Sequence, residues 1–82
     1  MMLRLKIVSP ERIEFEGEAE SVTVPGAVGN FEILKNHAPI ISSLVDGVVE
    51  YVTTQGEKIS LSVTGGFVSV HKNEVSLCVE KA

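Results

Sequence analysis

The 82-residue chain is poor in the residues that most often mark small stapled domains and membrane proteins. It has one cysteine, no tryptophan, three phenylalanines and one tyrosine. A single cysteine, Cys78, excludes an intrachain disulfide and zinc sites built from four cysteines or from two cysteines and two histidines. No apolar run approaches the roughly 18 residues of a membrane helix, and the N-terminus lacks the apolar core of a secretory signal. We therefore expect a soluble intracellular domain that suits a reducing cytosol.

Positive charge is also scarce. Seven Lys and Arg residues stand against eleven Asp and Glu, so the net charge is −4 at pH 7. This balance argues against nucleic acid as a partner, because nucleic-acid binding leaves a basic patch in the sequence. The length allows one domain, residues 1–82, and the 44% hydrophobic content allows a thin core.

The hydrophobic pattern indicates strands throughout. Short runs alternate between apolar and polar residues, are rich in Val, Ile and Thr, and are separated by turn-forming residues. Segment 40–45 is apolar enough to be covered on both faces, and Asp46-Gly47 is typical of a hairpin turn. The pattern predicts an all-β fold, a flattened antiparallel sandwich or barrel of nine or ten short strands with no helical domain. The expected strands are 3–7, 13–16, 22–24, 31–34, 40–45, 48–54, 59–63, 67–71 and 74–79.

One stretch interrupts this rhythm. Residues 25–39, PGAVGNFEILKNHAP, contain two prolines and two glycines and leave room for only a short strand at 31–34. Long irregular connections are uncommon in small domains and are often functional. We therefore expect this stretch to form the working end of the molecule.

The chain contains few groups that could perform chemistry. His71, at a strand end, is most simply solvated, and Cys78 is most simply a small packing residue on the second face of its strand. His37 lies in the irregular stretch, where capping a loop carbonyl or packing against Pro39 is favoured over metal binding. Gly26 and Gly29 do not form a phosphate-binding motif. No catalytic residues, metal or cofactor are predicted, and the residues indicate a binding or structural module.

Acidic residues gather near the N-terminus, at Glu11, Glu14, Glu16, Glu18 and Glu20. Such a cluster can be a cation site or a docking patch for a basic partner. The favoured interpretation is a solvated strand face that also protects an edge from mispairing, because the spacing of a calcium loop is absent.

Taken together, several motifs resemble the epsilon subunit of F-type ATP synthases, which is called delta in mitochondria. Each motif is weak alone, but their order and spacing are specific, and H-A-P after a glycine-punctuated loop is the most telling. They are L-x-I-V-S-P-E at 5–11, F-x-G-E-A-E at 15–20, V-P-G-x-x-G at 24–29, F-x-I-L-x-x-H-A-P at 31–39, G-G-F-x-x-V at 65–70 and N-x-V at 73–75.

The resemblance implies a ten-stranded β-sandwich at the foot of the central stalk, without catalytic activity of its own. In this family the sandwich binds the gamma subunit, touches the c-ring and helps to couple proton flow to ATP synthesis. The resemblance places the chain peripherally at the cytoplasmic face of the bacterial inner membrane. It implies c-ring contacts at Asn30, Phe31, Glu32, Lys35 and His37. The face that binds gamma stays open, with Val48, Val49, Tyr51 and Val52 as candidates.

The chain departs from the family pattern in three places. Most members have glycine at the position of Glu32 and Pro-Gly at Lys35-Asn36. Asparagine is the best replacement for glycine at positive φ, so this turn can survive. We hypothesise that Glu32 faces an arginine in the polar loop of the ring. The sequence also ends before the C-terminal helical hairpin of most bacterial members, which leaves open a natural short form or a truncated chain. Without the hairpin, the resemblance implies no nucleotide site.

Two other classes of protein remain as alternatives. A lipoyl or biotinyl carrier is also a flattened β-sandwich of this length, with its modified lysine at a hairpin tip. The lysines near turns here, Lys58 and Lys72, lack the Met or Asp neighbours usual in carriers. A small enzyme is disfavoured because no triad or metal cluster is present.

Overall fold

The computed structural model describes residues 2–82, which form seven β-strands and contain no helix. This confirms the all-β class that the alternating pattern predicted. The strands are β1 (Leu3–Val8), β2 (Ile13–Gly26), β3 (Gly29–Ile33), β4 (Ile40–Leu44), β5 (Gly47–Thr53), β6 (Lys58–His71) and β7 (Glu74–Lys81).

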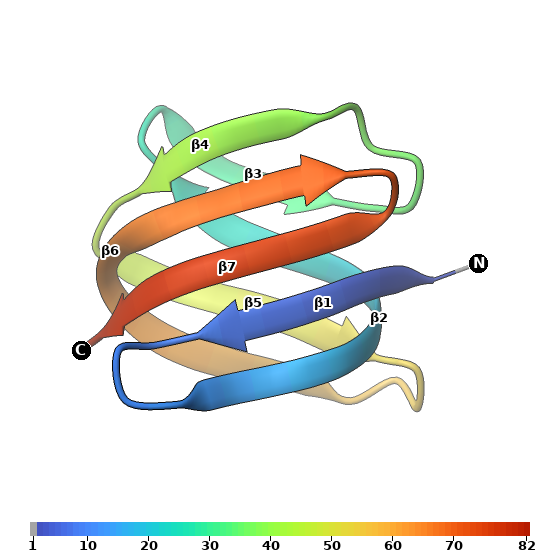
Figure 1. The fold of residues 1–82 in the computed structure, drawn as a ribbon, viewed down its shortest axis with the longest axis horizontal. Coiled ribbons are helices and arrows are strands. Elements are labelled where there is room, and N and C mark those ends of the chain that lie inside the picture. Colours follow the sequence, from blue (N-terminus) through green and yellow to red (C-terminus); the bar gives the residue numbers. More distant parts are fainter. Residues whose placement is uncertain (1) are drawn as a thin grey trace.

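Two long strands belong to both layers of the sandwich (Figure 1). The first half of β2 pairs with β1 and its second half with β3 and β5. Likewise β6 pairs first with β5 and then with β4 and β7. The register shifts between Ala19 and Ser21, and between Val63 and Gly65. Such bulges bend a strand without ending its ladder, so the expected count of nine or ten strands is wrong and the structure has seven.

The terminal strands form a parallel pair. Strand β1 lies beside β7 with Leu5 opposite Val75 and Ile7 opposite Leu77, while all other pairs are antiparallel. The sheet is therefore mixed, and the expectation of purely antiparallel pairing is wrong at this one junction. The sequence contains no turn signal for a parallel pair, because parallel strands are joined by a long connection and not by a hairpin turn.

Of three turns that the sequence predicted, two form hairpins in the structure and one does not. The Gln55-Gly56 turn joins β5 to β6, and Lys72-Asn73 joins β6 to β7, both as antiparallel hairpins. Asp46-Gly47 does not form a hairpin, because β4 pairs with β6 while β5 pairs with β2 and β6. This segment instead carries the chain from one layer to the other.

The core lies between the two layers and consists almost entirely of aliphatic side chains from alternate positions of each strand. Its largest fully buried members are Leu3, Leu5, Ile7, Val22, Val24, Ile33, Val49, Val63, Val68, Val75 and Leu77. The expectation that segment 40–45 is covered on both faces is wrong, since Ile41 is 82% exposed and Val45 is 45% exposed. Only one face of β4 meets the core.

Gly66 occupies the bend of β6, where its backbone approaches β7 closely. Its φ is +138°, and a Cβ atom there would lie 2.0 Å from the carbonyl oxygen of Cys78. Both observations confirm that the Gly65-Gly66 pair marks a corner that requires positive φ or close backbone packing. The bend of β6 therefore depends on the absence of a side chain at this position.

We predict that Gly66→Ala is severely destabilising. Gly29→Ala is a matched control, because Gly29 has a similar φ of +132° but open space around the missing Cβ. Backbone strain alone should lower the free energy of unfolding by about 1–3 kcal/mol in the control. The clash should add at least about 2 kcal/mol in Gly66→Ala. Urea denaturation measures both, and equal losses would contradict the clash.

Candidate functional site

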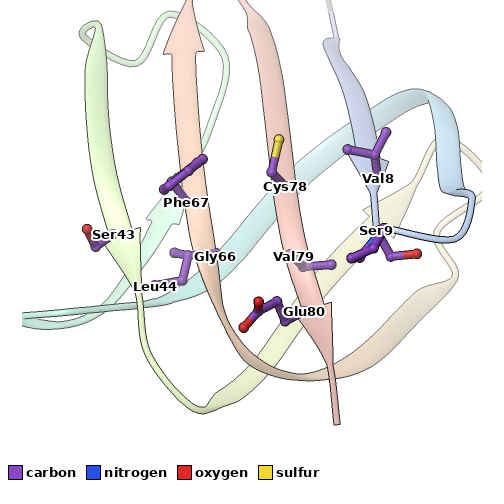
Figure 2. Close-up of a pocket in the computed structure, with 10 residues that line it drawn as sticks. Val8, Ser9, Ser43, Leu44, Gly66, Phe67, Cys78, Val79 and Glu80 are labelled. Atoms are coloured by element: carbon purple, nitrogen blue, oxygen red, sulfur yellow. The ribbon is translucent and has the colours of Figure 1, made fainter.

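The outer face of the layer formed by β4, β6, β7 and β1 carries an exposed apolar row. The strand registers place Ser43 opposite Phe67, Phe67 opposite Cys78 and Cys78 opposite Val8. Figure 2 shows Phe67, Cys78 and Val8 in this order across three neighbouring strands. Phe67 has a large aromatic side chain, yet it is 58% exposed.

A groove of about 640 Å³ follows this row. It is lined by Val8, Ser9, Pro10, Ser43, Leu44, Gly66, Phe67, Cys78, Val79 and Glu80. A second hollow on the same layer includes Ile41 and Ser69, so exposed apolar surface continues along β4. The small side chains of Ser9 and Ser43 line the first hollow together with Phe67. Exposed apolar surface of this kind marks a site of interaction. We call the first hollow the β6–β7 groove.

The structure places several residues differently from what the sequence suggested. Cys78 is exposed, so its expected role as a packing residue is wrong. Phe67 and Ile41 were not selected, although their positions alternate with buried Val68 and half-buried Ile40 and could have indicated an outward face. Among the candidates for binding gamma, Val49 and Tyr51 are buried in the core.

Another candidate for binding gamma, Val48, is 45% exposed. It lies on β5, which pairs with β2 and with the first half of β6. It therefore belongs to the layer opposite the β6–β7 groove.

A small charged network lies beside the groove and shares Ser9 with it. Ser9 donates a 2.8 Å hydrogen bond to Oε2 of Glu14, and Arg12 and Lys81 lie 3.3 and 3.5 Å from its carboxylate oxygens. The Ser9 hydrogen bond, together with the charges of Arg12 and Lys81, holds the pKa of Glu14 below its ordinary range, against an opposing effect of desolvation. The network joins the β1–β2 turn to the end of β7.

The other four glutamates of the acidic cluster, Glu11, Glu16, Glu18 and Glu20, are exposed. Across the β1–β2 ladder, Lys6 lies opposite Glu16 and Arg4 opposite Glu18. Opposite charges at facing positions support strand pairing. This arrangement agrees with the solvated strand face that the sequence favoured.

The predicted working end, residues 25–39, is not one irregular loop. It comprises the β2–β3 turn, the edge strand β3 and a connection at 34–39, and the turn and the connection lie at opposite ends of β3 (Figure 1). Asn30 lies near the turn, whereas Lys35 lies in the connection. A strand rises about 3.3 Å per residue. The sequence-predicted contact residues therefore extend along an edge of the molecule and do not form one cluster.

The individual side chains of this stretch differ in their surroundings. Asn30, Glu32 and Lys35 are exposed, whereas Phe31 and His37 are half-buried with ring centroids 6.4 Å apart. Of the five residues expected to contact the c-ring, the structure brings Phe31 and His37 together.

His37 interacts with its own loop. Its Nδ1 lies 2.7 Å from the carbonyl oxygen of Ala38, to which it donates as the Nδ1–H tautomer. This confirms the expectation that His37 caps a loop carbonyl. Asn36, in the turn before it, adopts a φ of 65°, as expected if asparagine replaces a glycine there. Among the residues that the structure describes, no group of three or more His, Cys, Asp or Glu side chains is arranged to hold a metal ion.

Comparison with known proteins settles the family. The model of the "ATP synthase, Delta/Epsilon chain, beta-sandwich domain" matches residues 2–82. The chain belongs to the ATP synthase delta/epsilon family. It is 43% identical over 79 residues to the ATP synthase epsilon chain of Leptospira interrogans, covering 95% of this chain and 61% of that protein. It is 41% identical to the epsilon chain of Nitratiruptor, covering 98% and 62%. The chain thus spans about three-fifths of the length of these curated relatives.

Solved structures share the fold of this delta/epsilon chain. One is a chain of the Euglena gracilis mitochondrial ATP synthase, from a structure of OSCP, F1 and the c-ring, with a TM-score of 0.90, 19% identity and coverage of 95% of this chain and 50% of that one. The other belongs to the Tetrahymena thermophila central stalk and c-ring, with a TM-score of 0.84, 16% identity and coverage of 99% and 65%. The search for membrane helices over residues 2–82 found no helix long and apolar enough to span a bilayer.

We predict that Glu14 stabilises the fold in a pH-dependent way. Because its pKa is lower in the folded chain than in the unfolded chain, its contribution is present above the ordinary carboxyl range and is lost as the pH falls through the lowered value. Glu14→Gln should therefore be less stable at pH 7 and should lose less stability on acidification than the wild type.

Urea unfolding at a series of pH values between about 2 and 7 measures this difference. Glu18→Gln is the control, because it removes an exposed carboxylate of the same strand and leaves the contacts of Glu14 intact. The prediction fails if Glu14→Gln follows the same pH profile as the wild type.

Proposed function

We propose that the chain is a non-catalytic rotor subunit of an F-type ATP synthase that links the gamma subunit to the c-ring and helps to couple proton translocation to ATP synthesis. Support comes from its membership of the delta/epsilon family and from relatives named ATP synthase epsilon chain. The fold neighbours come from structures that include a central stalk and a c-ring, which agrees with this role. The carrier-domain alternative has no support from these comparisons.

The observation that carries a docking role is the β6–β7 groove. Phe67 and Ile41 expose large apolar side chains on one layer, beside small serines. Interface cores combine aromatic anchors with pockets that exclude water. We assign this face to the gamma subunit, whose docked side chains would fill the space around Phe67. The assignment replaces the candidates on β5, of which Val49 and Tyr51 are already in the core.

The edge of β3 and the 34–39 connection are assigned to the c-ring. Asn30 and Glu32 alternate with half-buried Phe31 on β3, so both polar side chains face away from the core. Lys35 extends the polar edge into the connection, and His37 supports it from beside Phe31. An exposed polar edge suits the polar loops of a membrane-embedded ring. Such a subunit would lie peripherally at the cytoplasmic face of a bacterial inner membrane and would need no cofactor.

We predict that Phe67→Asp weakens binding to a purified gamma subunit by at least about tenfold, because a carboxylate would replace an apolar anchor. Phe67 is more than half exposed, so the thermal stability of the isolated chain should change little. Val48→Asp is the control, since Val48 is also exposed but lies on the opposite layer. Titration calorimetry distinguishes the cases: equal losses in both variants would refute the groove, and absent binding of the wild type would refute the proposed function.

We also predict that Glu32→Lys weakens coupling between proton flow and ATP hydrolysis in reconstituted enzyme. The proposed arginine of the ring's polar loop would then face a like charge. The wild-type pair should contribute only about 0–1 kcal/mol, because partly exposed ion pairs are weak, and should act mainly on docking register. ATP-driven proton pumping measures coupling, with Glu32→Gln as the neutral control. Unchanged pumping in the lysine variant would rule out the pair.

A further inference from the structure

We infer that Asn73 is a positioning residue for the 34–39 connection. Its side-chain amide, from the β6–β7 turn, holds the backbone of Asn36 and thereby sets how Lys35 and His37 are presented. Asn36 and Asn73 lie 37 positions apart in the sequence, on different connections. The effect of this contact on binding to the c-ring rests on the proposed function, whereas the contact itself does not.

The 34–39 connection has little regular support of its own. Its residues lie between β3 and β4 and take no position in the ladders of either strand. One local hydrogen bond, from the His37 amide to the Leu34 carbonyl at 3.1 Å, closes a turn within it. A turn of this kind fixes the local path of the chain but not its direction relative to the sandwich.

Asn73 offers a rigid anchor beside this connection. Lys72 and Asn73 have φ angles of 50° and 64°, as the central residues of a two-residue hairpin of type I′ require. The pair between His71 and Glu74 closes the hairpin. The backbone carbonyl of Asn73 also accepts a 2.8 Å hydrogen bond from the Arg4 amide, which attaches the turn to β1.

Two hydrogen bonds connect this anchor to the connection. The backbone amide of Asn36 donates to Oδ1 of Asn73 at 2.5 Å, and Nδ2 of Asn73 donates to Oδ1 of Asn36 at 3.4 Å. The first bond is short, and the second is near the limit for such a contact. Because Asn36 is itself at positive φ, the residue serves both the turn and the pair. Glycine at position 36 would preserve the turn but would remove the acceptor of the second bond.

The contact between Asn36 and Asn73 affects Lys35 and His37 because Asn36 lies between them in the sequence. Asn36 stands between Lys35 and His37, and the His37 ring already contacts Phe31 on β3. The connection is thus held on one side by this ring contact and on the other by Asn73. Loss of the hydrogen bonds to Asn73 would leave Lys35 and His37 free to sample other orientations. Binding to the ring would then carry the entropic cost of ordering them again.

The test uses two substitutions of the same residue and one control in the isolated chain. Asn73→Gly keeps the positive φ of the turn but removes both hydrogen bonds. Asn73→Asp tolerates the same φ and restores the acceptor for the Asn36 amide. Lys72→Gly alters the neighbouring turn position and leaves the Asn73 side chain in place. Hydrogen exchange of the Asn36 amide, followed by NMR, reports the contact directly, with the core amide of Val68 as the reference for global opening.

We expect exchange of the Asn36 amide to accelerate by about three- to tenfold in Asn73→Gly, as the loss of one net hydrogen bond implies. It should return toward the wild-type rate in Asn73→Asp and stay unchanged in Lys72→Gly. A merely structural role in the turn would leave the Asn36 rate unchanged in Asn73→Gly, because glycine keeps the positive φ, and that result would overturn the inference. Faster exchange in Asn73→Gly without recovery in Asn73→Asp would also overturn it.

A second measurement separates this inference from the proposed function. The affinity of each variant for a purified gamma–c-ring rotor should fall by about three- to tenfold in Asn73→Gly and recover in Asn73→Asp. Faster exchange with unchanged affinity would overturn the consequence for the ring and leave the contact intact. Failure of the wild-type chain to bind the rotor would overturn the proposed function, while the exchange result would still stand.

Discussion

The close approach of the β6 and β7 backbones at Gly66 is the constraint on which much of this molecule depends. No side chain fits between Gly66 and the Cys78 carbonyl, so β6 can bend there and continue from one layer into the other. The bend lets a single strand pair with β5, β4 and β7. Gly66 also lines the β6–β7 groove next to Phe67. The bend that closes the sandwich therefore lies beside the surface that we assign to docking.

Side chains alternate along each strand between the core, where they stabilise the fold, and the outer face, where they are available for interaction. Inward positions are filled by Val, Leu and Ile, which form a continuous aliphatic core. Outward positions on β4, β6 and β7 include Ser43, Ser69 and Ser76, and Ser43 lies opposite the exposed Phe67 in the groove. A thin core of this kind gives limited stability to a small domain. Docking of the groove on a partner would add stability by mass action.

Much of the fold could be predicted from local signals. Apolar alternation indicated strands throughout, and Gln55-Gly56 and Lys72-Asn73 indicated hairpins that the structure contains. The positive φ of Asn36 was expected because asparagine is the best residue after glycine for a turn of this kind. The strand count failed because a glycine that interrupts the alternation need not end a strand. The β1–β2 ladder continues through Gly17 without a shift, and Gly65 lies at a bulge of β6.

The candidate site was predictable only in part, for a physical reason. Local residue patterns were enough to predict strands throughout the chain and the family, because both depend on residues close together in the sequence. The edge position of β3, the shared groove of Val8, Cys78 and Phe67, the parallel pairing of β1 with β7 and the contact of Asn73 with Asn36 became visible only in the folded chain. Each of these depends on which strands become neighbours. Burial of the whole core selects that pairing, and no local run of residues encodes it.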